Sequence, residues 1–186
     1  METYRGTSLW HLDLNKLEKE LSVNSWIDES SLSRRWPSTL RILIRAKDVK
    51  MLLLTKGGKI LPIVKNGEAL DPIEIKQVPD VAVLVGEVFE KRKELRKKAI
   101  QVVEEIPYEG SFSQKTISEI HFDEKDGFWM TLIKNGIQVK LGQDQIALKS
   151  ARVSQVLDYM TTHKQEAHVI DANLSKKVLV RLKSDK

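Results

Sequence analysis

The sequence predicts an α+β protein, in which a short helix and two strands precede a mostly antiparallel β-sheet with two packed helices. Three observations support this fold class. From Lys50 onward, strand-length apolar or alternating runs follow one another at short intervals. Gly, Pro and Asn residues separate these runs, as turns require. Two longer stretches, 87–105 and 145–164, instead carry apolar residues at helical spacing.

The first fifty residues combine one helix with two strands. Leucines over 9–21 include the spacing of an amphipathic helix, and Asp13 is available as its N-cap. Alternating residues over 26–34 and 40–44 predict two strands, which the turn-like run 35–38 separates. The predicted order is therefore helix, strand, turn, strand.

A first hairpin is predicted around a glycine pair. Gly57 and Gly58 separate apolar runs over 51–55 and 59–64. The pair readily adopts the positive φ angles of a tight two-residue turn, so we expect these runs to pair as antiparallel strands.

A second hairpin is predicted where Asn135 and Gly136 separate alternating runs over 129–134 and 137–141. Asn-Gly between such runs is the usual signal for a type I′ turn, and one face of this hairpin is expected to be buried. The remaining predicted elements are a loop over 71–80, strands over 81–85, 117–122, 169–174 and 177–182, and the two long helices.

Residues that carry catalysis or bind cofactors show no recognisable arrangement. Cysteine is absent, which excludes disulfides, thiol nucleophiles and cysteine metal sites. The four histidines lack metal-ligand spacing, and no Gly-rich phosphate loop occurs. Acidic clusters such as 123–126 are typical of solvated turns. We therefore expect no enzyme activity and no metal, nucleotide or other cofactor.

The net charge of +5 is concentrated in two basic stretches, 91–98 and 176–186. Such runs usually lie on a solvated surface, and the functional alternative is binding of anionic lipid or nucleic acid. Neither stretch contains the interleaved aromatic residues of a single-strand nucleic-acid binder. The longest apolar runs are strand-sized, far short of the roughly 18 to 20 residues of a membrane span. No signal peptide opens the sequence.

A collinear series of short motifs runs along nearly the whole chain. Its N-terminal members are Gly6, Leu9, Leu12, Asp13, Leu14, Leu17, Trp26, Ile27, Ser30, the run 34–37, Leu40, Ile42 and Ile44. Its C-terminal members are Gly58, the run 83–86, Trp129, Asn135, Gly136, the run 139–142, Val153, Leu157, Ile170 and Asp171. This series resembles the FtsQ/DivIB family of bacterial cell-division proteins. The resemblance implies a partial POTRA domain at 1–48 and an FtsQ-type β domain at 49–186.

The resemblance also implies that parts of the protein lie outside this sequence. Family members carry a cytoplasmic tail and one transmembrane helix before the POTRA domain, and the first strand and helix of that domain are missing here. Met1 would then fall inside a domain. We expect the upstream codons to encode the missing strand and helix, preceded by a membrane span. The implied location is the periplasmic or extracytoplasmic face of the bacterial inner membrane.

The function implied by the resemblance is that of a non-enzymatic scaffold. It would bind FtsB/DivIC-type and FtsL-type division proteins and help to regulate septal peptidoglycan synthesis. Two alternatives remain open. One is another POTRA-type chaperone or secretion module, and the less favoured one is a basic nucleic-acid-binding domain.

The candidate binding site is the last predicted strand. Over 177–183, apolar residues alternate with mostly basic ones, so one face can be buried. A terminal strand commonly lies at a sheet edge, where unpaired backbone groups can accept a partner's strand. The resemblance implies the same use, with FtsB/DivIC adding its strand there. The predicted partner-binding residues are Leu174, Lys177, Val178, Leu179, Val180 and Arg181.

Two features of this strand qualify the prediction. Lys177 and Lys183 are compatible either with blocking strand pairing or with attracting an acidic partner. Relatives often carry aromatic residues at the positions of Leu174 and about Arg181, so contacts with the partner are expected to differ in detail.

Overall fold

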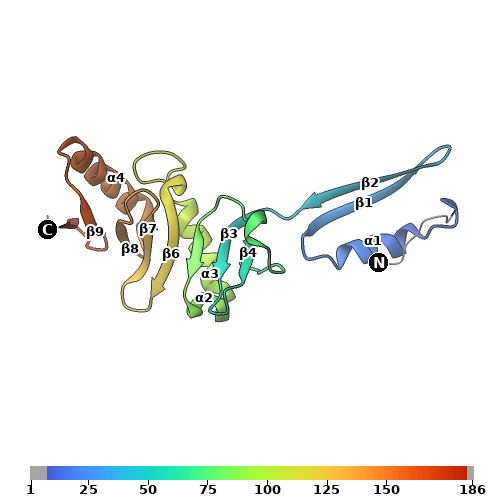
Figure 1. The fold of residues 1–186 in the computed structure, drawn as a ribbon, viewed down its shortest axis with the longest axis horizontal. Coiled ribbons are helices and arrows are strands. Elements are labelled where there is room, and N and C mark those ends of the chain that lie inside the picture. The colour runs from blue at the N-terminus through green and yellow to red at the C-terminus, as the bar shows by residue number, and fades with distance from the viewer. Residues whose placement is uncertain (1–7, 184–186) are drawn as a thin grey trace. The chain divides into compact units, whose positions relative to one another are not determined.

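A computed structural model describes residues 8–183, and in it the chain forms two compact units, Met1–Asp48 and Val49–Lys186 (Figure 1). Each unit has its own strands and helices. They are described separately below.

The first unit is a helix packed on a two-stranded hairpin. The helix α1 (Leu14–Ser22) begins after Asp13. The Asp13 carboxylate accepts hydrogen bonds from the backbone amides of Asn15 and Lys16, at 3.0 and 3.1 Å. The predicted N-cap is thus confirmed. The strands β1 (Ile27–Arg35) and β2 (Thr39–Ala46) pair antiparallel along their whole length. The order helix, strand, turn, strand is the predicted one.

The second unit is built on one eight-stranded sheet with the order β10-β9-β8-β7-β6-β5-β3-β4. Four of its seven neighbouring pairs are antiparallel, and β3–β5, β5–β6 and β8–β9 are parallel. The predicted α+β class is confirmed, and antiparallel pairs are in the majority. The strands are β3 (Val49–Leu54), β4 (Ile60–Val64), β5 (Val83–Val85), β6 (Ile117–Asp123), β7 (Gly127–Leu132), β8 (Gln138–Gly142), β9 (Ala167–Asp171) and β10 (Leu179–Leu182).

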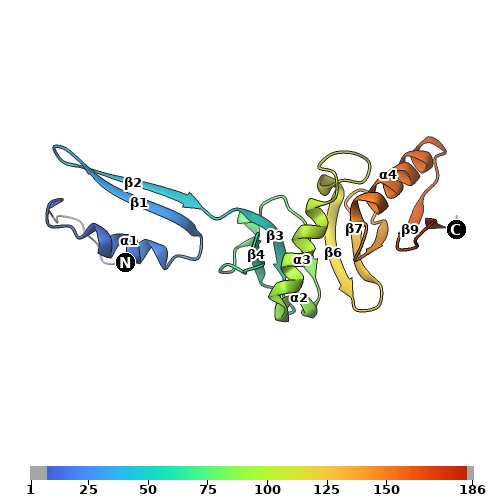
Figure 2. The ribbon, with the colours of Figure 1, turned by 180° about the vertical axis from the view of Figure 1, so that it is seen from behind.

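Helices pack on this sheet and bury one face of it. In Figure 2 the helices α2 (Glu87–Lys91) and α3 (Lys93–Glu104) lie in front of the strands, and α4 (Ile146–Thr162) follows β8. Two short 3₁₀ helices, Ile75–Gln77 and Gln114–Thr116, lie in the connections.

The core contains a continuous row of apolar side chains that crosses six strands. Each member lies directly opposite the next in the strand register, and each is at most 1% exposed. Because laterally paired residues point to the same face of a sheet, this register fixes which face is covered. The row is Leu53, Leu84, Ile120, Met130, Val139 and Ile170.

The helix predicted over 87–105 is broken at Arg92, which has an extended backbone. The break leaves the carbonyl groups at the end of α2 free to accept other donors. The buried guanidinium of Arg96 fills this role, donating to the Phe89 carbonyl oxygen at 2.6 Å and to Gly67 at 2.8 Å. A side chain therefore replaces part of the helical hydrogen-bond ladder at this point.

The hairpin around Asn135 is present, but the predicted type I′ turn is wrong. A type I′ turn needs positive φ at both central residues. Here Gly136 has φ 60°, whereas Asn135 stays at negative φ. The amide of Leu132 donates to Ile137 at 2.9 Å and so closes a four-residue loop, in which one left-handed residue suffices.

The first hairpin differs from its prediction in the same way. The amide of Thr55 donates to Lys59 at 3.0 Å, which leaves three residues in the loop rather than two. Gly58 alone of the glycine pair has positive φ, at 75°. The last two strands are also displaced from the predicted 169–174 and 177–182, because residues 172–178 form the connection between β9 and β10.

Candidate partner-binding edge

The sheet of the second unit ends differently on its two sides. At the β4 side, a following segment of the chain covers the edge, since Leu70 and Ile73 donate their amides to Pro62 and Ile60 at 2.8 and 3.0 Å. At the other side, β10 has β9 as its one strand neighbour among the described residues. The open edge of this sheet is therefore β10.

The backbone of β10 directs alternate amides to the outside. The amide of Lys183 donates inward to Glu166 at 2.9 Å. Alternate residues of a strand direct their amides to the same side, and the bulge in this pair lies in β9, so it leaves the alternation of β10 intact. Leu179 and Arg181 thus face β9, while Val180 and Leu182 present their backbone groups at the free edge.

Apolar side chains of the same region line a groove beside the free edge. The groove has a volume of about 570 Å³ and lies between α4 and the end of the chain. Val178, Val180 and Leu182 form one wall, and the α4 residues Val156, Tyr159 and Met160 form the other. A strand added to β10 would place every second side chain over this groove.

Basic groups lie at one end of the groove. Arg152, Lys176 and Lys177 line it, and no Asp or Glu is among its lining residues. The guanidinium of Arg152 donates to the carbonyl oxygen of Ser175 at 3.0 Å and so ties α4 to the β9–β10 connection. This end of the groove suits an acidic group on a partner.

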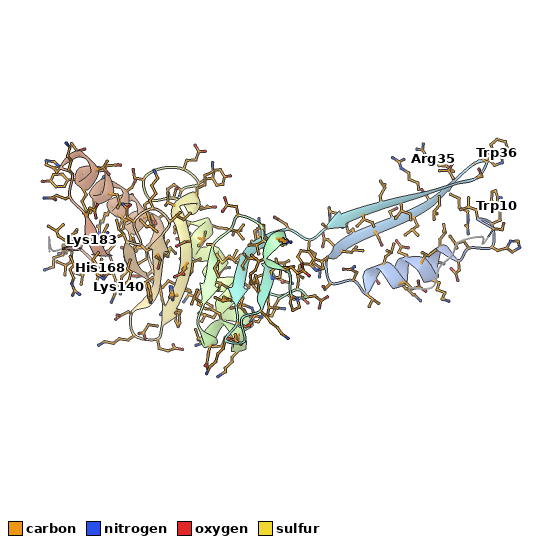
Figure 3. The ribbon with its side chains drawn as sticks, in the orientation of Figure 1. Trp10, Arg35, Trp36, Lys140, His168 and Lys183 are labelled. Carbon is orange, nitrogen blue, oxygen red and sulfur yellow. The ribbon has the colours of Figure 1, made fainter. Side chains whose placement is uncertain are left out.

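The opposite face of β10 is also basic, but its charges are partly paired. Lys183 forms an ion pair with Glu166 at 3.1 Å, and on β8 Lys140 pairs with Asp126 at 3.0 Å. The hydrogen bond that Lys140 donates to the Asp126 carboxylate raises the pKa of Lys140. Figure 3 labels Lys140, His168 and Lys183, which lie on or next to the neighbouring strands β8, β9 and β10.

The lysines that were candidates for blocking the edge lie outside the strand itself. Lys177 precedes β10 and Lys183 follows it. Between them, Leu179 and Leu182 are 52% and 49% exposed. Although β10 has only four residues, its exposed apolar side chains and open backbone groups can serve as a template for pairing with another chain.

A buried lysine holds the connection that leads to β10. Lys149 on α4 is 3% exposed, and its ammonium donates to Leu141 at 2.9 Å, Asp144 at 2.6 Å and Asn173 at 3.2 Å. The ion pair and hydrogen bond from Lys149 lower the pKa of Asp144. One side chain thus joins the start of α4 to the ends of β8 and β9.

The structure brings most of the predicted binding residues together, though on different sides. Lys177, Val178 and Val180 line the groove, whereas Leu179 and Arg181 point to the opposite face of β10. Leu174 is half-buried in the connection before β10 and is not a lining residue. The sequence reading missed the groove wall on α4 and the basic Arg152 and Lys176. Their role depends on α4 packing beside the last strand, which no local pattern reports.

Residues 8–183 hold no group of three or more His, Asp or Glu side chains placed to bind a metal ion. None of the helices in the described part of the chain is long and apolar enough to cross a membrane.

The described residues thus form an α+β module of two units, a helix packed on a hairpin followed by a mixed sheet with β10 as its open edge strand. Comparison with protein families identifies the family of both units. The model for the cell division protein FtsQ/DivIB C-terminal domain matches residues 52–173, and the POTRA domain of FtsQ type matches residues 1–45. The chain therefore belongs to the FtsQ/DivIB family, as its motifs predicted.

Curated relatives agree with this assignment. The chain is 24% identical over 184 residues to the cell division protein FtsQ of Syntrophotalea carbinolica, and 25% identical over 191 residues to that of Geobacter sp. strain M21. Each alignment covers 95% of this chain but only 64% and 66% of the relatives. The chain thus spans just under two thirds of the length of these proteins.

Proposed function

We propose that this chain is a scaffold module of bacterial cell division, which binds an FtsB/DivIC-type partner by accepting its strand at β10. Together with FtsL-type proteins, such a complex would help to regulate septal peptidoglycan synthesis. The module would act at the extracytoplasmic face of the inner membrane and would carry out no catalysis itself. Membership of a cell-division family supports the cellular role, and the open edge supports the mode of binding.

The observation that carries the proposal is the asymmetry of the eight-stranded sheet. Its β4 edge is covered by residues of the same chain, while within residues 8–183 no strand pairs with the outward backbone groups of Val180 and Leu182 on β10. Strand addition at such an edge obtains its affinity from the backbone ladder and its specificity from alternate side chains.

The chemistry around β10 specifies the partner segment. Side chains facing α4 would be apolar, because the walls of the groove are apolar there. An acidic residue at the end near Arg152 and Lys177 would meet positive charge. We expect a segment of alternating apolar and polar residues with at least one carboxylate, as electrostatic complementarity favours.

A substitution at the free edge tests this proposal. Val180→Pro removes a backbone donor that points outward and restricts the local φ. Loss of one or two ladder bonds is expected to weaken binding of the cognate FtsB/DivIC-type segment by about tenfold or more in calorimetric titration.

The matched control is Val180→Thr, which keeps the amide and the β-branched shape and should retain most of the affinity. Circular dichroism must show that both variants fold. Unchanged affinity in a folded Val180→Pro protein would exclude β10 as the accepting strand.

A further inference from the structure

The tip of the β1–β2 hairpin exposes two tryptophans from different segments of the first unit. Trp36, in the turn between the strands, is 85% exposed, and Trp10, just before α1, is 63% exposed. Figure 3 shows both at the same end of this unit, with Arg35 nearby. Large aromatic side chains are usually buried, so two at one exposed tip require an explanation.

A charged side chain fixes this arrangement. The guanidinium of Arg34, next to the turn, donates to the carbonyl oxygen of Leu9 at 3.0 Å and also to that of Leu12. These bonds tie the hairpin tip to the segment on either side of Trp10. Arg34 thus holds the segments that carry the two tryptophans at the same end of the unit.

The tip is also positively charged. Residues 30–44, which include the turn and the adjoining parts of both strands, contain three basic residues and no Asp or Glu. Arg41 lies opposite Ser33 and Arg35 lies opposite Thr39, so both arginines point to the same face of the hairpin, two positions apart along the pair. Arg45, farther from the tip, is paired with Asp28 and Glu29 at 3.0 and 2.6 Å.

From these features we infer that the hairpin tip is a contact site for the surface of an anionic lipid bilayer, a function separate from strand addition at β10. An indole ring has an apolar body and an N–H donor, and it favours the headgroup region of a membrane. Arginines beside it are attracted to anionic headgroups. The exposed tryptophans and the arginines beside them therefore complement the apolar and anionic character of such a bilayer surface.

The test uses the whole chain and vesicles of two compositions, phosphatidylcholine alone and an equal mixture with phosphatidylglycerol. The protein should float with the anionic vesicles at low salt, and binding should weaken as salt screens the charges. Each basic side chain near an anionic surface strengthens binding about fivefold, so Arg35→Gln/Arg41→Gln should lower the partition coefficient about 30-fold. If the indole rings enter the headgroup region, tryptophan emission should shift to shorter wavelength when anionic vesicles are added. Trp10→Ala/Trp36→Ala should abolish this shift and should also lower the partition coefficient.

Two matched variants serve as controls. Lys93→Gln/Lys97→Gln removes the same charge from exposed positions of α3, and Tyr108→Ala removes an exposed aromatic ring of the second unit that lies outside the groove. Both should bind vesicles as the unaltered chain does. Absence of flotation with anionic vesicles would overturn the inference. So would equal binding to neutral vesicles, or an equal loss in the control variants. Binding to an acidic peptide without binding to vesicles would assign the tip to a protein partner instead.

Discussion

The ammonium of Lys149 lies 3.2 Å from the side-chain oxygen of Asn173, which joins the start of α4 to the residues that follow β9. Asn173 in turn donates to the carbonyl oxygen of Asp126 at 3.2 Å, before β7. This chain of contacts lies at the start of the connection to β10. It helps to set where the candidate binding strand begins.

Replacing Lys149 by Met should destabilise the second unit. The change removes three hydrogen bonds and leaves the buried carbonyl of Leu141 without this donor. We expect a loss of about 2–4 kcal/mol in the free energy of unfolding, measured in urea. Lys97→Met, at an exposed position on α3, should change it by less than about 0.5 kcal/mol. Equal effects in the two variants would contradict this role of Lys149.

The ion pair between Asp144 and Lys149 should make stability depend on pH in acid. Because the pKa of Asp144 is lowered in the folded chain, its stabilising contribution is complete above the unfolded value of about 3.9 and declines as pH falls below it. Asp144→Asn should therefore lower Tm at neutral pH, and the difference from the unaltered chain should shrink in acid. A difference that stays constant down to about pH 2, well below the unfolded value, would contradict the assignment.

A pair of glycine substitutions separates backbone strain from steric conflict. Gly142 and Gly136 both have positive φ, at 78° and 60°. A Cβ on Gly142 would lie 2.0 Å from the Asn173 side-chain oxygen, whereas a Cβ on Gly136 meets nothing within 4 Å. Gly136→Ala should cost about 1–2 kcal/mol from strain alone. Gly142→Ala should cost about 2–5 kcal/mol, because the Asn173 side chain must move away and lose its hydrogen bonds with Lys149 and Asp126 in addition to the strain. Thermal unfolding of both variants measures the difference.

The basic end of the groove should affect how fast a partner binds. Lys176→Glu/Lys177→Glu reverses two charges there, and it should lower the association rate constant of an acidic FtsB/DivIC-type segment by about tenfold at low salt. The dissociation rate should change less, since the backbone ladder remains. Lys93→Glu/Lys97→Glu is the control for net charge. If surface plasmon resonance shows the effect only in dissociation, the lysines act through direct contact rather than steering.

Most of the secondary structure could be predicted because it follows from local patterns. Alternation predicted β1, β2, β7 and β8, and the Asp13 N-cap indicated the start of α1. The break at Arg92 could not be predicted in this way. It depends on Arg96 reaching Gly67, 29 positions away in sequence, and the run 87–105 itself keeps a helical period.

The candidate site was predictable only in part, for a related reason. The alternation over 177–183 predicted a strand, and its place at the chain end suggested an edge. The groove beside it requires β9 to run parallel to β8, which positions α4 as the crossover next to the last strand. In the sequence, Lys149 resembles an ordinary solvated lysine of an amphipathic helix, and only the tertiary fold shows that it is buried.

The closed β4 edge has a consequence for assembly. Head-to-tail growth of open filaments needs two different complementary surfaces on each copy. Because this eight-stranded sheet offers strand pairing on one side only, it cannot extend through successive copies. Self-association through the sheet would end at a symmetric β10–β10 pair, and an incoming partner strand would compete with that pair for the same backbone groups. Binding at this edge is therefore expected to have a fixed stoichiometry of one partner strand per chain.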